Sequence, residues 1–241
     1  MILDIYKDAF EYAAQDISTL IKLGVLSFFG FLIIPIFLVL GYQYRIIDIG
    51  INGMVDGEDK LPEFNEFTSM FIDGIKVFLV QIIYIIIPII IFLIFATLSQ
   101  VTNIQVFDLI GLIIGVIGLI IAVLYSFMAI PNMIKNDGSF SAAFDFERIN
   151  EVIKMVGILR YIAFVIGLVL ITLIIAIVVM TILLFIAGIF GVAIIAVNPL
   201  SAPGVVLLSV VVFIAIFSFI VSPYLSIFSG RANGLIYGVG A

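Results

Sequence analysis

Five long stretches of the chain consist almost entirely of apolar residues, and they limit the possible folds more than any other feature. The hydrocarbon core of a bilayer is about 30 Å thick, and a helix of about 20 apolar residues crosses it. Hydrophobic residues are 65% of the 241 residues, against roughly 45–50% apolar content in soluble domains. The sequence therefore predicts an all-α fold, a polytopic transmembrane helical bundle forming one membrane domain, 1–241. The predicted spans are about 23–44, 77–98, 109–130, 161–186 and 205–228.

The segment 187–197 leaves the number of spans open. Its sequence, AGIFGVAIIAV, is apolar but too short to cross a bilayer, and NPLSAPG with two prolines follows it. We interpret it as an extension of the fourth span or as a re-entrant piece, with a sixth span as the alternative. We therefore expect about five spans, within a range of four to six, in a multi-pass protein of the cell (plasma) membrane.

A lysine or arginine marks one end of every predicted span. Cytoplasmic loops of membrane proteins carry an excess of these residues, so we expect the marked ends to face the cytoplasm. The topology-setting cations are Arg45, Lys76, Lys135, Arg160 and Arg231. With five crossings, this orientation places the C-terminus inside and the N-terminus outside.

Two further lysines conflict with that topology. Lys22 lies at the outer end of the first span, and Lys7 precedes it. A single crossing by 23–44 is our first interpretation. The alternative is a re-entrant hairpin bent near Gly30 and Pro35, which would place all the amphipathic segments of the chain on the cytoplasmic face.

Three segments combine an apolar face with a charged face at helical spacing, each ahead of an apolar span. They are 2–22, 63–76 and 139–157, and their recurrence suggests a weak internal repeat. In the second segment the interfacial face consists of Phe64, Phe67, Phe71 and Ile75. We interpret these segments as interfacial helices, the second and third on the cytoplasmic side, with their apolar faces in the acyl boundary. The functional alternative is a coupling helix that docks a cytoplasmic protein.

Prolines and glycines within the apolar segments indicate kinks and close helix packing. A proline inside a helix removes a backbone donor and frees a carbonyl group. The possible kinks are at Pro35, Pro88, Pro131 and Pro223. A GxxxGxxG run, formed by Gly111, Gly115 and Gly118, would let another helix approach closely. Both features are common in membrane helices, and proline breaks also form binding sites in transporters.

The residue inventory excludes several kinds of chemistry. Without cysteine or histidine the chain has no thiolate, disulfide or haem chemistry, no common zinc site, and no Ser-His-Asp or Cys-His catalysis. The lack of charged residues deep in the spans argues against a proton-coupled transporter or an ion pump, and the net charge of −6 against nucleic acid. We predict no catalytic residue, cofactor or metal. The loop acids that could still hold a divalent cation are Asp56, Glu58 and Asp59, and Asp145 with Glu147.

Three short motifs resemble a known family. They are GYQYR at 41–45, LPEF at 61–64 with FIDGIK after it, and FSAAFDFERI at 140–149 ahead of a span that begins with tyrosine. In order and spacing they resemble the domain of unknown function 4013 group, multi-pass membrane proteins found mainly in archaea. The chain is also loosely similar to the membrane domain attached to some glycerophosphodiester phosphodiesterases, without the catalytic domain. The resemblance implies a location and an architecture, and it transfers no site.

These observations lead to a ranked set of functions. The first is a non-catalytic integral membrane protein, an interaction or accessory component that contacts the lipid bilayer and a membrane or cytoplasmic protein partner. The alternative is a transporter or permease for an apolar or amphipathic solute, with a cavity near Pro88 and Pro223. A lipid-modifying enzyme ranks third, because the surface acids lack an evident base or metal partner.

Overall fold

The computed structural model describes residues 1–197 and 202–241, and these residues form helices without any strand. The elements are α1 (Ile2–Ala13), α2 (Ile17–Phe28), η1 (Gly30–Leu32), α3 (Ile34–Asn52), α4 (Phe67–Thr102), α5 (Val106–Lys135), η2 (Phe140–Phe144), α6 (Phe146–Val156), α7 (Ile158–Val197), α8 (Ala202–Ile216), η4 (Phe217–Val221) and α9 (Ser222–Gly240). The all-α class is confirmed. Among the described residues, five helices are long and apolar enough to cross a membrane: Ile34–Asn52, Phe67–Thr102, Val106–Lys135, Ile158–Ile189 and Ala202–Gly240.

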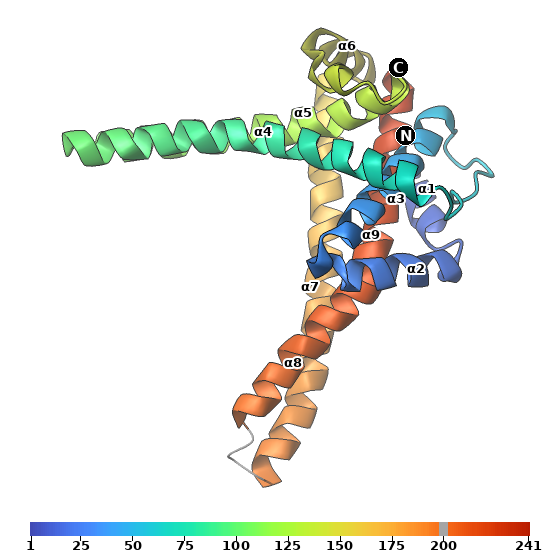
Figure 1. Ribbon diagram of the computed structural model, residues 1–241, viewed down its shortest axis with the longest axis vertical. Helices are drawn as coiled ribbons and strands as arrows, with labels where there is room; N and C mark the ends of the chain where they lie inside the picture. Colours follow the sequence, from blue (N-terminus) through green and yellow to red (C-terminus); the bar gives the residue numbers. More distant parts are fainter. Residues whose placement is uncertain (198–201) are drawn as a thin grey trace.

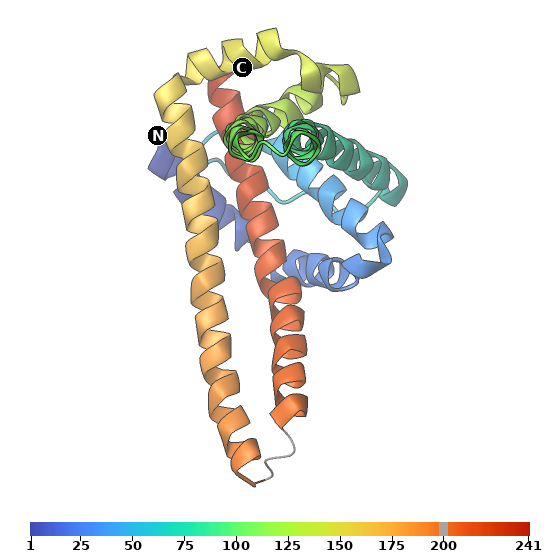
Figure 2. The same cartoon turned by 90° about the vertical axis from the view of Figure 1, so that its left-hand side faces the viewer.

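The helices form a core at one end of the molecule, and two long hairpins project from it (Figures 1 and 2). α4 and α5 form the first hairpin, with Asn103 in a left-handed conformation at its turn (φ 56°). α7 and α8 form the second, and α8 continues through the π-helical turn η4 into α9. The hairpins leave the core in different directions, so insertion of both into one planar bilayer requires one of them to rotate relative to the other.

α3 runs through the core, and glycines set how closely its neighbours approach. At the crossing with α4, a Cβ atom on Gly41 would lie 1.7 Å from the carbonyl oxygen of Met70, and one on Gly74 would lie 1.8 Å from the α3 backbone. At the crossing with α9, a Cβ atom on Gly234 would lie 2.4 Å from the carbonyl oxygen of Ile47. Small residues allow such close approach between membrane helices. Any larger side chain at these positions would push the helices apart.

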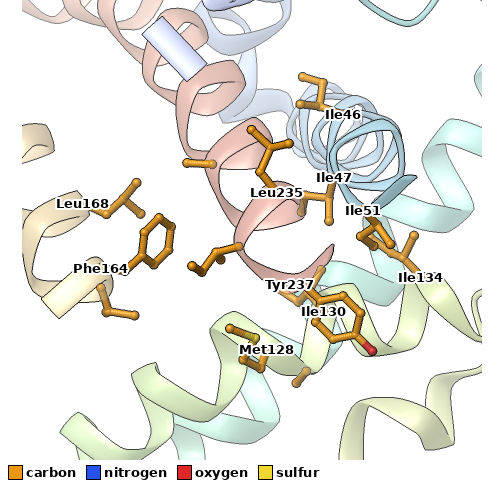
Figure 3. Close-up of a cluster of buried hydrophobic side chains, with 14 of the residues drawn as sticks. Ile46, Ile47, Ile51, Met128, Ile130, Ile134, Phe164, Leu168, Leu235 and Tyr237 are labelled. Atoms are coloured by element: carbon orange, nitrogen blue, oxygen red, sulfur yellow. The ribbon is translucent and has the colours of Figure 1, made fainter. Parts of the chain in front are cut away.

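Apolar side chains from α3, α5, α7 and α9 form one core around α9 (Figure 3). The labelled residues, all at most 6% exposed, are Ile46, Ile47 and Ile51 of α3, Met128, Ile130 and Ile134 of α5, Phe164 and Leu168 of α7, and Leu235 and Tyr237 of α9. Outside the core the hairpins are open. At most 22% of the most apolar window of α4, α5 or α7 is buried, so their outer surfaces are available to lipid.

The predicted first span, 23–44, is not one helix in the structure. α2 ends at Phe28, the turn η1 follows, and Ile33 adopts a positive φ of 69° before α3 begins. Pro35 lies in the first turn of α3, where a helix does not need the backbone donor that proline lacks. The break therefore lies near Gly30 and Pro35, as in the re-entrant alternative, and α3 is the helix of spanning length.

The N-terminal amphipathic segment, predicted as 2–22, is divided between α1 and α2. The division lies at Asp16, whose carboxylate caps the N-terminus of α2. It accepts hydrogen bonds from the backbone N–H groups of Ser18 and Thr19 at 2.9 and 3.0 Å. The Thr19 hydroxyl and the two N–H groups lower the pKa of the Asp16 carboxyl, which keeps the cap ionised.

The other two amphipathic segments also differ from their predicted bounds. Segment 63–76 is not a separate helix, because α4 begins at Phe67 and continues without a break into its apolar part. Segment 139–157 contains η2 and α6, and it ends at Gly157, whose φ of 94° turns the chain into α7. The segment 187–197 is the continuation of α7, so it is an extension of the fourth span.

α1 packs against the core, so the N-terminus lies at the same end of the molecule as the C-terminus (Figures 1 and 2). The Tyr6 hydroxyl donates a hydrogen bond to the carbonyl oxygen of Phe164 near the start of α7. Lys22 of α2 has its Nζ atom 5.6 Å from the centre of the Phe64 ring. Two termini at one end agree with the re-entrant alternative, whereas five crossings would place them on opposite sides of the bilayer. This arrangement removes the conflict over the N-terminal lysines if α2 and α3 enter and leave the bilayer on one side.

Single-cysteine variants test this topology, because the native chain has no cysteine. With α2 and α3 re-entrant, Leu3→Cys and Ser139→Cys are labelled from the same side of oriented vesicles by a membrane-impermeant maleimide. Asn103→Cys, at the far end of the first hairpin, is labelled from the opposite side. Labelling of Leu3→Cys together with Asn103→Cys, and not with Ser139→Cys, would contradict the re-entrant arrangement.

The glycine crossings make a second prediction. Gly41→Ala and Gly74→Ala each lower the stability by about 1–3 kcal/mol or more, because the new methyl group overlaps a backbone carbonyl. Thermal unfolding of the purified protein in detergent measures the loss. Gly30→Ala is the matched control, since its Cβ atom meets nothing within 4 Å. Equal unfolding temperatures for Gly74→Ala and Gly30→Ala would contradict the close crossing.

Candidate functional site

An apolar groove with a volume of about 350 Å³ lies between α4 and α5 and is closed at one end by η2 and α6. Its lining residues are Ile83, Tyr84, Ile87, Pro88, Ile91, Gly118, Ile121, Ala122, Tyr125, Phe144 and Phe146. Among them the two tyrosines are the only titratable groups. The groove therefore suits a hydrocarbon group.

The floor of the groove follows from the glycine run of α5. Cβ atoms on Gly111, Gly115 and Gly118 would lie 2.6, 3.2 and 2.9 Å from the Cβ atoms of Phe95, Phe92 and Pro88 on α4. The two helices are therefore in close contact along this run. Pro88 is buried inside α4, and its ring leaves the carbonyl group of Tyr84, four residues earlier, without its usual helical donor.

Tyrosines close the end of the groove nearest the core. The Tyr84 hydroxyl donates to the carbonyl oxygen of Ala143 in η2 at 2.7 Å, and the Tyr125 hydroxyl to Oδ1 of Asn150 in α6 at 2.7 Å. The ring of Phe144 stacks on Tyr84 with 5.6 Å between the ring centres. These contacts fix η2 and α6 as a cap over the groove.

A buried ion cluster around Arg231 joins distant parts of the chain. Arg231 is 0% exposed, and its Nε atom lies 2.7 Å from Oδ1 of Asp8 in α1. Its Nη1 atom lies 2.9 Å from Oδ2 of Asp59, which makes an ion pair without the geometry of a directed hydrogen bond. Nη2 donates to the carbonyl oxygen of Met54 at 3.2 Å. One guanidinium thereby connects α9, α1 and the segment 53–66.

An aromatic ring completes this cluster. The Cζ atom of Arg231 lies 4.6 Å from the centre of the Tyr12 ring, within the range of a cation–π contact. Burial raises the pKa of the Tyr12 hydroxyl, so it stays protonated and donates to the carbonyl oxygen of Lys60 at 3.0 Å. The guanidinium of Arg231 is paired with the carboxylates of Asp8 and Asp59. The cluster therefore acts as a structural link between these segments and not as a ligand site.

The predicted topology-setting cations lie beside the core in different surroundings. Arg45 donates to the backbone and side chain of the segment 63–66. Lys76 pairs with a carboxylate on its own helix at 3.5 Å, and Lys135 donates to a side chain at the end of α3 at 3.1 Å. Arg160 is exposed at the start of α7. Arg231 differs from the others because it is completely buried.

The four predicted kink prolines have separate positions. Pro88 lines the groove. Pro35 lies in the first turn of α3. Pro223 lies inside the continuous helical run Ala202–Gly240, directly after the π-helical turn η4. Pro131 does not end its span, because α5 continues through it to Lys135. The structure therefore brings one of the four prolines to a candidate binding site.

The predicted interfacial face, Phe64, Phe67, Phe71 and Ile75, differs from the face of α4 that packs against the core. Phe64 precedes α4 and stacks on Tyr42 with 4.4 Å between ring centres, Phe71 is partly buried, and Phe67 is 54% exposed. Ile75 is also partly buried. The residues that face the core are Met70, Gly74 and Val77. The helix is rotated so that Gly74 meets α3, which a pattern of large apolar residues does not indicate.

The loop acids proposed as a possible cation site are separated by their partners. Asp59 faces Arg231, and Asp56 Oδ1 lies 3.9 Å from the Nζ atom of Lys7. Asp145 caps α6 by accepting from the backbone N–H of Arg148 at 3.0 Å. Within residues 1–197 and 202–241, no three His, Cys, Asp or Glu side chains form a group that could hold a metal ion.

Comparison with known proteins adds a family. Residues 28–185 match the family described as "Protein of unknown function (DUF4013)". No curated protein and no solved structure matches the chain. The matched range contains the α3–α4 crossing and the groove, whereas Asp8 and Arg231 lie outside it.

The ion cluster predicts a large effect of one substitution. Arg231→Met lowers the free energy of unfolding by about 3–5 kcal/mol, because it leaves the buried carboxylate of Asp8 without its partner. Arg148→Met is the control, since the exposed Arg148–Glu151 pair contributes only about 0–1 kcal/mol. Thermal unfolding in detergent measures both. A loss for Arg231→Met no larger than that of the control would show that the buried cluster does not hold the core together.

Proposed function

We propose a function from the geometry of the site, because the chain belongs to the DUF4013 family, whose description assigns no activity. The chain is a membrane protein, and five helices in the part of it that the structure describes are long and apolar enough to cross a bilayer. Its proposed function is non-catalytic. It is a membrane-embedded component that binds the hydrocarbon part of an amphipathic molecule in the groove between α4 and α5.

The shape and chemistry of the groove support this function. Its volume of about 350 Å³ lies at the lower end of the roughly 300–1,000 Å³ range of small-molecule sites. Lipid tails are as apolar as leucine, so a site within a membrane gains affinity from shape and packing more than from the hydrophobic effect. The groove offers a fitted surface of this kind, with Pro88 and Gly118 in contact at its floor.

The closed end of the groove supports an amphipathic occupant over a purely apolar one. Tyr84 and Tyr125 lie there, and such amphipathic rings favour the level of the lipid head groups. The cap helix α6 buries Ile149, Val152, Ile153 and Val156 and exposes its charged residues. A head group beside α6 would therefore meet polar surroundings while its chain follows the groove.

A second role rests on the same helix. The outward residues of α6 include Glu147, Arg148, Glu151 and Lys154, and its apolar face is already covered by the core. The charged face is thus available to a protein partner, as expected for an interaction or accessory component. A stoichiometric partner that is recovered from mild detergent with the native chain, and lost with charge reversal of Arg148 and Lys154, would support this role.

A substitution that fills the groove tests the binding function. Ala122→Phe places a ring in the groove and lowers the affinity for a fluorescent fatty-acid analogue or a single-chain phospholipid at least about tenfold, or ~1.4 kcal/mol. Ala163→Phe is the control, because Ala163 is exposed on α7 and does not line the groove. Binding is measured by titration of the delipidated protein in detergent. Equal affinities of native chain and Ala122→Phe would rule out the groove as the site.

A further inference from the structure

Four aromatic rings lie together at the closed end of the groove between α4 and α5. They belong to Tyr84, Tyr125, Phe144 and Phe146, and all four residues line the groove. The Phe146 ring makes T-shaped contacts with the rings of Tyr84 and Tyr125, with interplanar angles of 72° and 62° and ring centres 6.3 and 5.7 Å apart. The Phe144 ring is stacked on that of Tyr84. The closed end therefore has aromatic walls in more than one orientation, as do sites that surround an ammonium group.

The polar side-chain atoms at this end act toward a ligand as hydrogen-bond acceptors. The Tyr84 hydroxyl donates its hydrogen to the carbonyl oxygen of Ala143. The Tyr125 hydroxyl donates its hydrogen to Oδ1 of Asn150, so both hydroxyls retain only oxygen lone pairs for a ligand. The carbonyl group of Tyr84 adds a backbone acceptor, because Pro88 has no N–H to donate to it. The other described residues that line the groove have no polar side-chain atom.

The charges nearest to these rings along the chain are mainly negative. Asp145 and Glu147 flank Phe146, and both carboxylates are exposed at the start of α6. Arg148 follows them, and its charge is balanced by that of Glu151, 3.1 Å away. Among the described residues that line the groove there is no lysine or arginine. The electrostatic potential at the closed end therefore favours a cation over an anion.

We propose that the closed end of the groove selects an amphipathic ligand whose head group is a positively charged ammonium. This inference rests on the proposed function, because it names the class of head group for the same groove. An ammonium group is attracted to the faces of aromatic rings, and its N–H groups donate to the carbonyl oxygen of Tyr84 and to the two tyrosine hydroxyls. A carboxylate finds no side-chain donor there. An alcohol can donate one hydrogen bond, but it has no charge to interact with the rings.

The experiment compares three ligands that share one hydrocarbon chain: decylammonium, decanol and decanoate. Each is titrated into the delipidated full chain in a maltoside detergent at about pH 8, where the amine is protonated and the carboxylic acid is ionised. Calorimetry measures binding. The same titrations of Ala122→Phe, whose groove is filled, give the heat of partition into detergent micelles. We expect decylammonium to bind at least about tenfold more tightly than decanoate, with decanol between them.

The outcomes separate this inference from the function on which it rests. Equal affinities of the three ligands, or tightest binding of decanol or decanoate, would overturn the preference for an ammonium group. The groove would then still be a site for hydrocarbon chains. Heats that match those of Ala122→Phe for all three ligands would instead show that the groove binds no such chain, and both proposals would fail.

A variant tests the aromatic walls directly. Phe146→Leu removes one ring and keeps an apolar side chain, so it weakens decylammonium binding about fivefold and changes the affinity for decanol by less than about twofold. Phe185→Leu is the matched control, because the Phe185 ring is exposed on α7 and does not line the groove. We expect native affinities for this control. Equal weakening of both ligands by Phe146→Leu, or no weakening of either, would mean that the ring does not recognise the charge, which overturns the proposal.

Discussion

The rest of the structure depends on the backbone contacts that α3 makes with two other helices. Gly41 and Gly74 let α3 and α4 touch, and Gly234 does the same between α9 and α3. Because dispersion forces act only at contact, this close approach provides much of the attraction between helices in a membrane, where no hydrophobic effect operates between them. α3 thereby brings together α4, from the first hairpin, and α9, which follows the second.

The stabilising interactions are concentrated at the end of the molecule where α3 lies. The core in Figure 3, the buried Arg231 and both termini lie there, while the hairpin helices are mostly open. A buried ion pair alone contributes little net stability, but loss of one partner is costly. Packing of α9 therefore depends on α1, because the Arg231 charge can be buried only when Asp8 of α1 is in contact with it.

The sequence allowed the class, the family and the presence of five long apolar helices to be predicted, because length and apolarity depend only on local composition. The first span was mispredicted, because hydropathy does not register a turn such as η1 between two apolar helices. The cluster of Arg231 could not be predicted. Its partner Asp8 is 223 residues away, and each residue looks like an ordinary surface charge. Pro88 was a candidate on its own, but η2 and α6, which close its groove, are distant in sequence.

The first hairpin carries the candidate binding groove. The groove lies between α4 and α5 under the cap of η2 and α6. The hairpins must also rotate relative to each other to share one planar bilayer. Since α4 and α5 form the walls of the groove and η2 and α6 close its end, a rotation that moves the hairpin against this cap changes the shape of the groove. A ligand that fits one arrangement of the hairpin better than another therefore shifts the equilibrium between these arrangements.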